Sequence, residues 1–215
     1  ECAAGTYQAS TGQSSCTDAS AGYYVDSTTQ TAQTACLAGT YNTNTASTTS
    51  SDCLDASAGY YVDSTLGVAQ TTQTACLAGT YNVNTGSTTS SDCVDADAGN
   101  YVGSTGQTTQ TACAVGTYQA STGQSSCTDA SAGYYVDSTL GVAQTSQTAC
   151  LAGTYNVNTG STTSSDCVDA DAGNYVGSTG QTTQTACAVG TYQASTGQSS
   201  CTDASAGYYV DSTTQ

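Results

Sequence analysis

The amino-acid sequence predicts an all-β, loop-rich protein, an elongated rod of tandem 17- or 20-residue repeats cross-linked by disulfides. A Gly followed two positions later by a Tyr recurs twelve times, and the spacing between successive copies takes only two values, as from Gly5 to Gly22 and from Gly39 to Gly59. Leu and Val supply 20 of the 215 residues, and there is no Ile, Phe, Met or Trp, which is too little for a globular core. The 12 Cys at regular spacing are therefore expected to provide the missing stabilisation.

The Gly-x-Tyr element predicts one brief strand in each repeat. Gly-Thr-Tyr and Gly-Tyr-Tyr-Val are β-prone and follow a Gly that can adopt a positive φ or allow a close backbone approach. We expect each Tyr ring to pack on the neighbouring repeat, and a ligand-binding row of aromatic rings is the alternative. The Gly positions are Gly5, Gly22, Gly39, Gly59, Gly79, Gly99, Gly116, Gly133, Gly153, Gly173, Gly190 and Gly207. The Tyr positions are Tyr7, Tyr24, Tyr41, Tyr61, Tyr81, Tyr101, Tyr118, Tyr135, Tyr155, Tyr175, Tyr192 and Tyr209.

Turn sequences follow each predicted strand. Ser-Thr-Gly-Gln at 10–13 and Asn-Thr-Gly-Ser at 84–87 are typical of turns. The length difference between repeats falls in this region, which places the additional residues 66–68 and 140–142 at solvent-facing loop tips. No segment has helical periodicity, and the richness in Thr, Ser and Gly disfavours helix.

Cysteines alternate between successive repeats when each repeat is counted from three positions before its Gly. The first residues of repeats 1 to 12 are then Cys2, Ala19, Cys36, Ala56, Cys76, Ala96, Cys113, Ala130, Cys150, Ala170, Cys187 and Ala204. The closing position of the repeat alternates in step between Cys and Gln, as in Cys16, Gln33 and Cys53, so odd repeats hold two Cys and even repeats hold none. We expect pairs of repeats as structural modules, at 2–35, 36–75, 76–112, 113–149, 150–186 and, truncated, 187–215.

The in-step alternation favours a disulfide between the two ends of each odd repeat. The predicted bonds are Cys2 to Cys16, Cys36 to Cys53, Cys76 to Cys93, Cys113 to Cys127, Cys150 to Cys167 and Cys187 to Cys201. The alternative joins each closing Cys forward across an even repeat, as Cys16 to Cys36, and the sequence leaves it open. Closing a loop of roughly 15 residues with a disulfide contributes about 3 kcal/mol to the stability of the folded chain in the chain-entropy model. Zinc is not favoured, because there is no His and no CxxC pair.

Odd repeats such as CAAGTYQASTGQSSCTD resemble the cysteine-rich tandem repeats of the ephrin-receptor-like and TNF-receptor-like families. The resemblance spans residues 2–215 and rests on Cys-x-x-Gly-Thr-Tyr and on the repeat length. The chain departs from the families' closing C-x-x-C, since each junction keeps only one of the two cysteines. The resemblance implies an extracellular rod of short β elements without catalytic function.

Charge and composition exclude several classes of partner and activity. The chain has no Lys, Arg or His and a net charge of -16, which excludes nucleic acid and anionic membrane surfaces as ordinary partners. No stretch approaches the ~20 apolar residues of a membrane span, so no membrane insertion is expected in this segment. We expect no enzymatic activity and no cofactor, because the usual bases and electrophiles are missing and the Cys are committed to disulfides.

Two groups of polar residues are candidates for binding or modification. The densest carboxylates, weak candidates for calcium, are Asp92, Asp95, Asp97, Asp166, Asp169 and Asp171, and solvated surface charge is the alternative. The chain has no Asn-x-Ser/Thr sequon, so we expect any glycans to be O-linked, with bare polar loops as the alternative. The candidate acceptors are Ser47, Thr48, Thr49, Ser50 and Ser51.

A longer duplication indicates a structural role. Residues 55–139 recur at 129–213, with only Thr72 and Ser146 differing, so no segment there is set apart as a one-off site. We expect an extracellular or cell-surface structural protein, a stalk or a self-assembling fibre whose partners are copies of itself and O-linked glycans. A receptor-like or adhesive binding module is the alternative.

Overall fold

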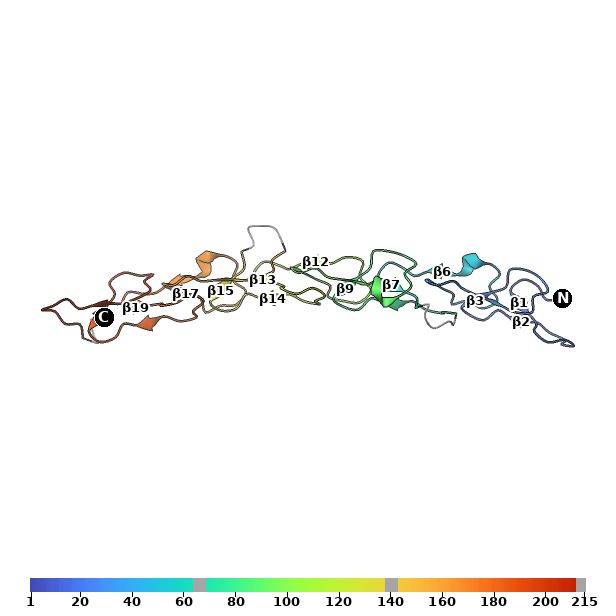
Figure 1. Ribbon diagram of the computed structural model, residues 1–215, viewed down its shortest axis with the longest axis horizontal. Helices are drawn as coiled ribbons and strands as arrows, with labels where there is room; N and C mark the ends of the chain where they lie inside the picture. Colours follow the sequence, from blue (N-terminus) through green and yellow to red (C-terminus); the bar gives the residue numbers. More distant parts are fainter. Residues whose placement is uncertain (64–68, 138–142, 212–215) are drawn as a thin grey trace. The chain divides into compact units, whose positions relative to one another are not determined.

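The computed structural model describes residues 1–63, 69–137 and 143–211. It confirms the predicted all-β, loop-rich class, because nearly all its regular structure consists of two-residue strands paired in antiparallel hairpins (Figure 1). The expected insertions at 66–68 and 140–142 lie outside the described residues. The chain forms two compact bodies, the first of 1–96, 102–110 and 123–125, the second of 97–101, 111–122 and 126–215.

Each of the first five repeats forms one hairpin within the first body. The strands are β1 (Thr6–Tyr7) with β2 (Thr17–Asp18), β3 (Tyr23–Tyr24) with β4 (Thr34–Ala35), β5 (Thr40–Tyr41) with β6 (Leu54–Asp55), β7 (Tyr60–Tyr61) with β8 (Thr74–Ala75), and β9 (Thr80–Tyr81) with β10 (Val94–Asp95). In each hairpin the Tyr of Gly-x-Tyr lies opposite the first residue of the returning strand, as Tyr41 lies opposite Leu54.

The second body repeats this hairpin six times. Its strands are β11 (Asn100–Tyr101) with β12 (Thr111–Ala112), β13 (Thr117–Tyr118) with β14 (Thr128–Asp129), β15 (Tyr134–Tyr135) with β16 (Thr148–Ala149), β17 (Thr154–Tyr155) with β18 (Val168–Asp169), β19 (Asn174–Tyr175) with β20 (Thr185–Ala186), and β21 (Thr191–Tyr192) with β22 (Thr202–Asp203).

Three short 3-10 helices correct the expectation that the chain contains no helix. They are η1 (Ser50–Asp52), η2 (Ser90–Asp92) and η3 (Ser164–Asp166), and each lies in a 20-residue odd repeat just before the closing Cys. The Asp that ends each one accepts hydrogen bonds from backbone N–H groups at its start, a local interaction without hydrophobic periodicity.

The Gly before each strand is required by a tight turn. In repeat 3 the N–H of Thr40 donates to the carbonyl of Leu37, and Gly39 occupies the third turn position with a φ of 80°. A type II turn needs a positive φ at that position, which Gly adopts without a steric cost. The same positive φ recurs at the corresponding Gly of all twelve repeats.

Successive repeats are joined by a backbone hydrogen-bond ladder. Between repeats 4 and 5, Gly59 donates to the carbonyl of Asn82 at 2.7 Å, and Val62 donates to that of Ser87 at 2.9 Å. A third bond returns from the N–H of Gly86 to the carbonyl of Ala56 at 2.8 Å. These backbone groups therefore find partners in the neighbouring repeat, which lets two-residue strands persist.

Repeats two positions apart also touch. A Cβ added to Gly39 of repeat 3 would lie 2.2 Å from the carbonyl oxygen of Gly86 in repeat 5. Among even repeats, a Cβ on Gly59 would lie 2.2 Å from the carbonyl oxygen of Gly106. Odd repeats therefore stack on odd repeats and even on even, and the absence of a side chain on Gly allows this approach.

The buried interior of the repeats is small and alternates in chemistry. The even repeats 2 to 10 bury an Ala and a Val, such as Ala56 and Val62 of repeat 4, which are 0% and 1% exposed. The 20-residue odd repeats 3, 5 and 9 place an Asn at the corresponding Val position, and it is buried as fully. No buried side-chain nitrogen or oxygen lacks a hydrogen-bond partner in the part of the chain that the structure describes.

Candidate functional site

The six disulfides each close one odd repeat. They join Cys2 to Cys16, Cys36 to Cys53, Cys76 to Cys93, Cys113 to Cys127, Cys150 to Cys167 and Cys187 to Cys201, which is the within-repeat pairing. All twelve Cys lie in the described ranges, where none is free and no disulfide crosses an even repeat. The bond joins chain segments that the hairpin already holds close, with 5.7 Å between the Cα atoms of Cys36 and Cys53.

A Gln closes the even repeats at the position of the second Cys. The side-chain oxygen of Gln33 accepts a hydrogen bond from the N–H of Ser20 at 2.7 Å. Gln73 and Gln147 make the same bond to Ser57 and Ser131, again at 2.7 Å. The sequence contained the signal for this role, since Gln alternates in step with Cys, but the residue type alone did not identify the partner.

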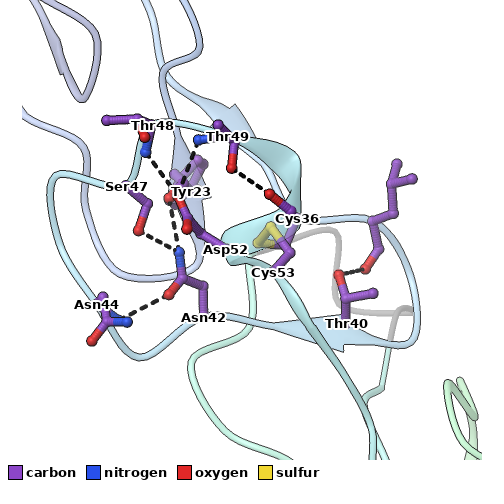
Figure 2. Close-up of a disulfide and its surroundings, with 12 residues drawn as sticks. Tyr23, Cys36, Thr40, Asn42, Asn44, Ser47, Thr48, Thr49, Asp52 and Cys53 are labelled. Atoms are coloured by element: carbon purple, nitrogen blue, oxygen red, sulfur yellow. Dashed lines mark hydrogen bonds between the residues drawn. A yellow bond between two sulfur atoms is a disulfide. The ribbon is translucent and has the colours of Figure 1, made fainter.

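A buried amide holds the loop of each 20-residue odd repeat (Figure 2). Asn42 Nδ2 donates to Ser47 Oγ at 2.7 Å and to the carbonyl of Tyr23, in the preceding repeat, at 3.4 Å. Its Oδ1 accepts from the N–H of Asn44 at 2.9 Å. One side chain therefore connects the loop of repeat 3 to the hairpin of repeat 2. Asn82 and Asn156 repeat the arrangement, which sequence analysis did not identify.

The Asp that ends each 3-10 helix caps the start of the same helix with its carboxylate. Asp166 Oδ2 accepts from the N–H groups of Thr162 and Thr163, at 2.8 and 3.0 Å. These backbone hydrogen bonds hold the pKa of Asp166 below its ordinary value because they stabilise the charged carboxylate, and the bond from Thr162 has the larger effect. Asp52 and Asp92 make the equivalent bonds in repeats 3 and 5.

The six calcium candidates are not brought together. Asp92 and Asp166 cap the 3-10 helices, whereas Asp95 and Asp169 end the exposed strands β10 and β18. Asp171 Oδ2 accepts from Gln184 Nε2 at 2.7 Å, and Asp97 is exposed. No group of three or more His, Cys, Asp or Glu side chains within 1–63, 69–137 and 143–211 could hold a metal ion.

The candidate glycan acceptors of repeat 3 differ in exposure. Thr48, Thr49, Ser50 and Ser51 are exposed, although the hydroxyls of Thr49 and Ser51 share a hydrogen bond. Ser47, the fifth candidate, differs from the other four, because it is only 7% exposed and its hydroxyl is bonded to Asn42. Attaching a sugar there would break the contact that holds the loop.

The repeated Tyr side chains lie at the surface of the hairpins. They are half-buried in repeats 1 to 10, whereas Tyr192 and Tyr209 of the last two repeats are 38% and 86% exposed. Tyr60, the first of the two Tyr after Gly59, also lies against another repeat, since a Cβ on Gly106 would lie 3.0 Å from its hydroxyl oxygen, and Tyr134 lies in the same way against Gly180.

A second position with positive φ lies seven positions after the turn Gly. Most repeats have Gly there, as at Gly86 with a φ of 68°, but Thr29 and Ala46 adopt φ values of 63° and 55°. A side chain in this left-handed region costs roughly 1–2 kcal/mol. The N–H of this residue donates to the carbonyl of the first residue in the preceding repeat, as that of Ala46 does to Ala19. This hydrogen bond holds the left-handed conformation in place.

Comparison with known protein families and with curated protein sequences returns no match. No protein-family model matches the chain, and no curated protein has a matching sequence. Among the described residues, no helix has the length and apolar character needed to cross a membrane. Six disulfides are typical of proteins that fold in an oxidising compartment, which indicates a secreted or extracellular protein.

Proposed function

We propose that the chain is an extracellular structural protein, a disulfide-cross-linked stalk or self-assembling fibre with O-linked glycans on its exposed Ser and Thr. The observation that carries the proposal is the backbone ladder. The same bonds join repeats in both bodies, for example Gly59 to Asn82 and Gly133 to Asn156. A repeat that docks on its neighbour through its own backbone can be multiplied without a new interface, as in other solenoid proteins.

The acidic surface determines how copies of such a chain associate. With a net charge of -16 and no cationic residue, neighbouring chains repel one another over about 10 Å at 0.1 M salt. Lateral association is therefore expected to need divalent cations, high salt or a layer of glycans that shields the carboxylates.

Electron microscopy of the native protein tests this role, together with its intact mass. Filaments, and a mass above the 21.3 kDa of the polypeptide by several sugars per repeat, are the expected results. Deglycosylated chains should form bundles with calcium but not with sodium at equal ionic strength. Isolated monomers with a saturable partner would exclude the fibre, and the bare polypeptide mass without any calcium effect would exclude glycans and cation bridging.

A receptor-like or adhesive binding module is the second candidate. The resemblance of Cys-x-x-Gly-Thr-Tyr to ephrin-receptor-like and TNF-receptor-like repeats supports it, as does the exposure of aliphatic residues on odd repeats. Leu37 and Val189 are 80% and 75% exposed, although the chain is poor in such residues. A saturable protein ligand that binds the monomer would favour this candidate over a purely structural role.

A further inference from the structure

The aliphatic side chains divide between odd and even repeats. Among the described residues, the five buried Val all lie in even repeats, at Val25, Val62, Val102, Val136 and Val176. Within the same described ranges, the Leu and Val that are more than half exposed lie in odd repeats, at Leu37, Leu54, Leu77, Val83, Val94, Val115, Leu151, Val157, Val168 and Val189. The part of the chain that the structure describes thus exposes more Leu and Val side chains than it buries, which the packing of the repeats does not require.

The exposed residues are densest on repeats 5 and 9. In repeat 5, Leu77, Val83 and Val94 are 72%, 63% and 54% exposed, and we call this trio the aliphatic patch of the repeat. Leu77 and Val94 directly follow the two Cys of one disulfide, whose Cα atoms lie 5.7 Å apart. Val94 lies opposite Tyr81, which is two positions from Val83. Repeat 9 has the equivalent patch of Leu151, Val157 and Val168.

A shallow cavity lies beside the Leu of each patch. The cavity at Leu77 has a volume of about 190 Å³ and lies between repeats 4 and 5. Tyr61 and Thr74 of repeat 4 line it together with the Cys76–Cys93 disulfide. The corresponding cavity beside Leu151 has a volume of about 120 Å³. Apolar pockets of this kind accept the anchoring side chains of a protein partner.

The odd repeats that stack on repeats 5 and 9 carry exposed aliphatic residues of their own. Gly39 of repeat 3 approaches Gly86 of repeat 5 in the first body, and Gly153 of repeat 9 approaches Gly197 of repeat 11 in the second. Leu37 and Leu54 are thus on the repeat that stacks on repeat 5, and Val189 is on the repeat that stacks on repeat 9. Each body therefore presents exposed aliphatic residues on consecutive odd repeats.

The charge beside the patches selects the kind of partner. The exposed Asp95 and Asp169 directly follow Val94 and Val168, and the chain contains no Lys, Arg or His. A second copy placed on a patch would bring carboxylates together without a cation to offset them. A partner with Lys or Arg next to its own aliphatic side chains is complementary to both the patch and its carboxylate.

We propose that the aliphatic patches of repeats 5 and 9 bind cationic amphipathic segments of another protein. The partner's aliphatic side chains contact the patch and its cavity, and its Lys or Arg side chains contact Asp95 or Asp169. A single patch is much smaller than the ~1,200 Å² of a stable interface, so tight binding requires contact with several odd repeats. The proposal goes beyond the structural role and does not depend on filament formation.

Binding of synthetic peptides to the oxidised chain tests the proposal. Fluorescence anisotropy compares three peptides of equal length, made of Lys and Leu, of Lys and Ser, and of Glu and Leu. The Lys/Leu peptide should bind at least tenfold more tightly than the other two, with an affinity that falls as salt rises. Equal binding of the Lys/Leu and Lys/Ser peptides would overturn the proposal, since charge alone would then explain it.

Variants locate the binding surface. The sixfold variant L77S, V83S, V94S, L151S, V157S and V168S should lose at least tenfold in affinity for the Lys/Leu peptide, while T71S, T72S and T145S on even repeats should bind like the parent chain. The double variant D95N and D169N should bind the Lys/Leu peptide more weakly, with a smaller dependence on salt. This variant tests the proposal even if the sixfold variant misfolds. Unchanged binding of a correctly oxidised sixfold variant would overturn the proposal. Self-association that this variant abolishes, without peptide binding to the parent chain, would also overturn it and identify a second copy as the occupant.

Discussion

Gln73 accepts a hydrogen bond from the backbone N–H of Ser57, with 2.7 Å between Oε1 and N. Gln73 stands where an odd repeat has its closing Cys, and Ser57 follows the residue that corresponds to the opening Cys. The ends of this even repeat are thus closed by a hydrogen bond at the place where odd repeats have a covalent bond. The backbone around the closure is the same in both kinds of repeat. The N–H of Cys76 donates to the carbonyl of Gly59 in even repeat 4, and the N–H of Ala56 donates to the carbonyl of Gly39 in odd repeat 3.

Removing the Gln side chain should destabilise an even repeat. The Q73A variant leaves the N–H of Ser57 without its acceptor, so we expect a loss of about 0.5–1.5 kcal/mol in the free energy of unfolding. Q73E keeps an acceptor oxygen at the same reach and serves as the control. Urea denaturation of the oxidised proteins measures both values, and equal stability of Q73A and the parent chain would mean that the bond does not contribute.

A glycine at the second positive-φ position should stabilise repeat 3. Ala46 has a φ of 55°, whereas Gly86 occupies the same position in repeat 5. We expect A46G to raise the free energy of unfolding by about 0.5–1 kcal/mol, because relief of the left-handed conformation exceeds the entropy cost of Gly. G86A should lower it by a similar amount. Thermal denaturation measures both, and a lower Tm for A46G would contradict the expectation.

Removing a buried amide should cost more than removing an exposed one. N82A leaves the Ser87 hydroxyl and the Tyr60 carbonyl without the Asn82 donor, and we expect a loss of about 1–3 kcal/mol. N156A should have a similar effect in the second body. The control N84A changes an exposed side chain and should stay within about 0.5 kcal/mol of the parent chain. An equal effect of N82A and N84A, by urea denaturation, would exclude the bracing role of Asn82.

The cap of η3 should weaken in acid. The pKa of Asp166 is lowered in the folded chain by the N–H groups of Thr162 and Thr163. Its contribution to stability is therefore complete above the unfolded pKa of about 3.9 and is lost as the pH falls through the lower folded value. The difference in Tm between the parent chain and D166N should be largest near pH 7 and should vanish in acid. A difference that is independent of pH would show that the charge of Asp166 has no part in the cap.

Reduction should unfold the chain. Among the described Leu and Val residues, only five Val side chains are fully buried. Each disulfide closes a loop of 14 or 17 residues, which contributes about 3 kcal/mol to stability in the chain-entropy model. We expect a phosphine reductant to abolish the β signal in circular dichroism and to increase the hydrodynamic radius. Heating the oxidised chain over the same period is the control. A reduced chain with an unchanged radius would mean that the backbone ladder suffices.

The repeat, the strand position and the disulfide pairing could be predicted because they depend on spacing and on residue types with few roles. Gly39 and its counterparts are an example, since a Gly at a fixed offset before a β-prone run indicates a positive φ or a close backbone approach. The roles of Gln73 and Asn82 could not be predicted, because both side chains bond to groups that only the folded hairpins bring near. Burial of Ser47 has the same origin, since Thr48 is exposed although both residues belong to one Ser/Thr run.

Closure of each odd repeat on itself determines how the protein responds to a stretching force. A pull on the two ends of the chain can lengthen the even repeats by breaking hydrogen bonds, but the residues between Cys76 and Cys93 cannot extend while their disulfide is intact. Reducing that one bond releases 17 residues, which adds contour length on the order of 60 Å at the reach of an extended chain. The extensibility of the chain therefore depends on the redox state of its surroundings. Under oxidising conditions only the hydrogen-bonded even repeats can extend, and under reducing conditions the odd repeats can extend as well.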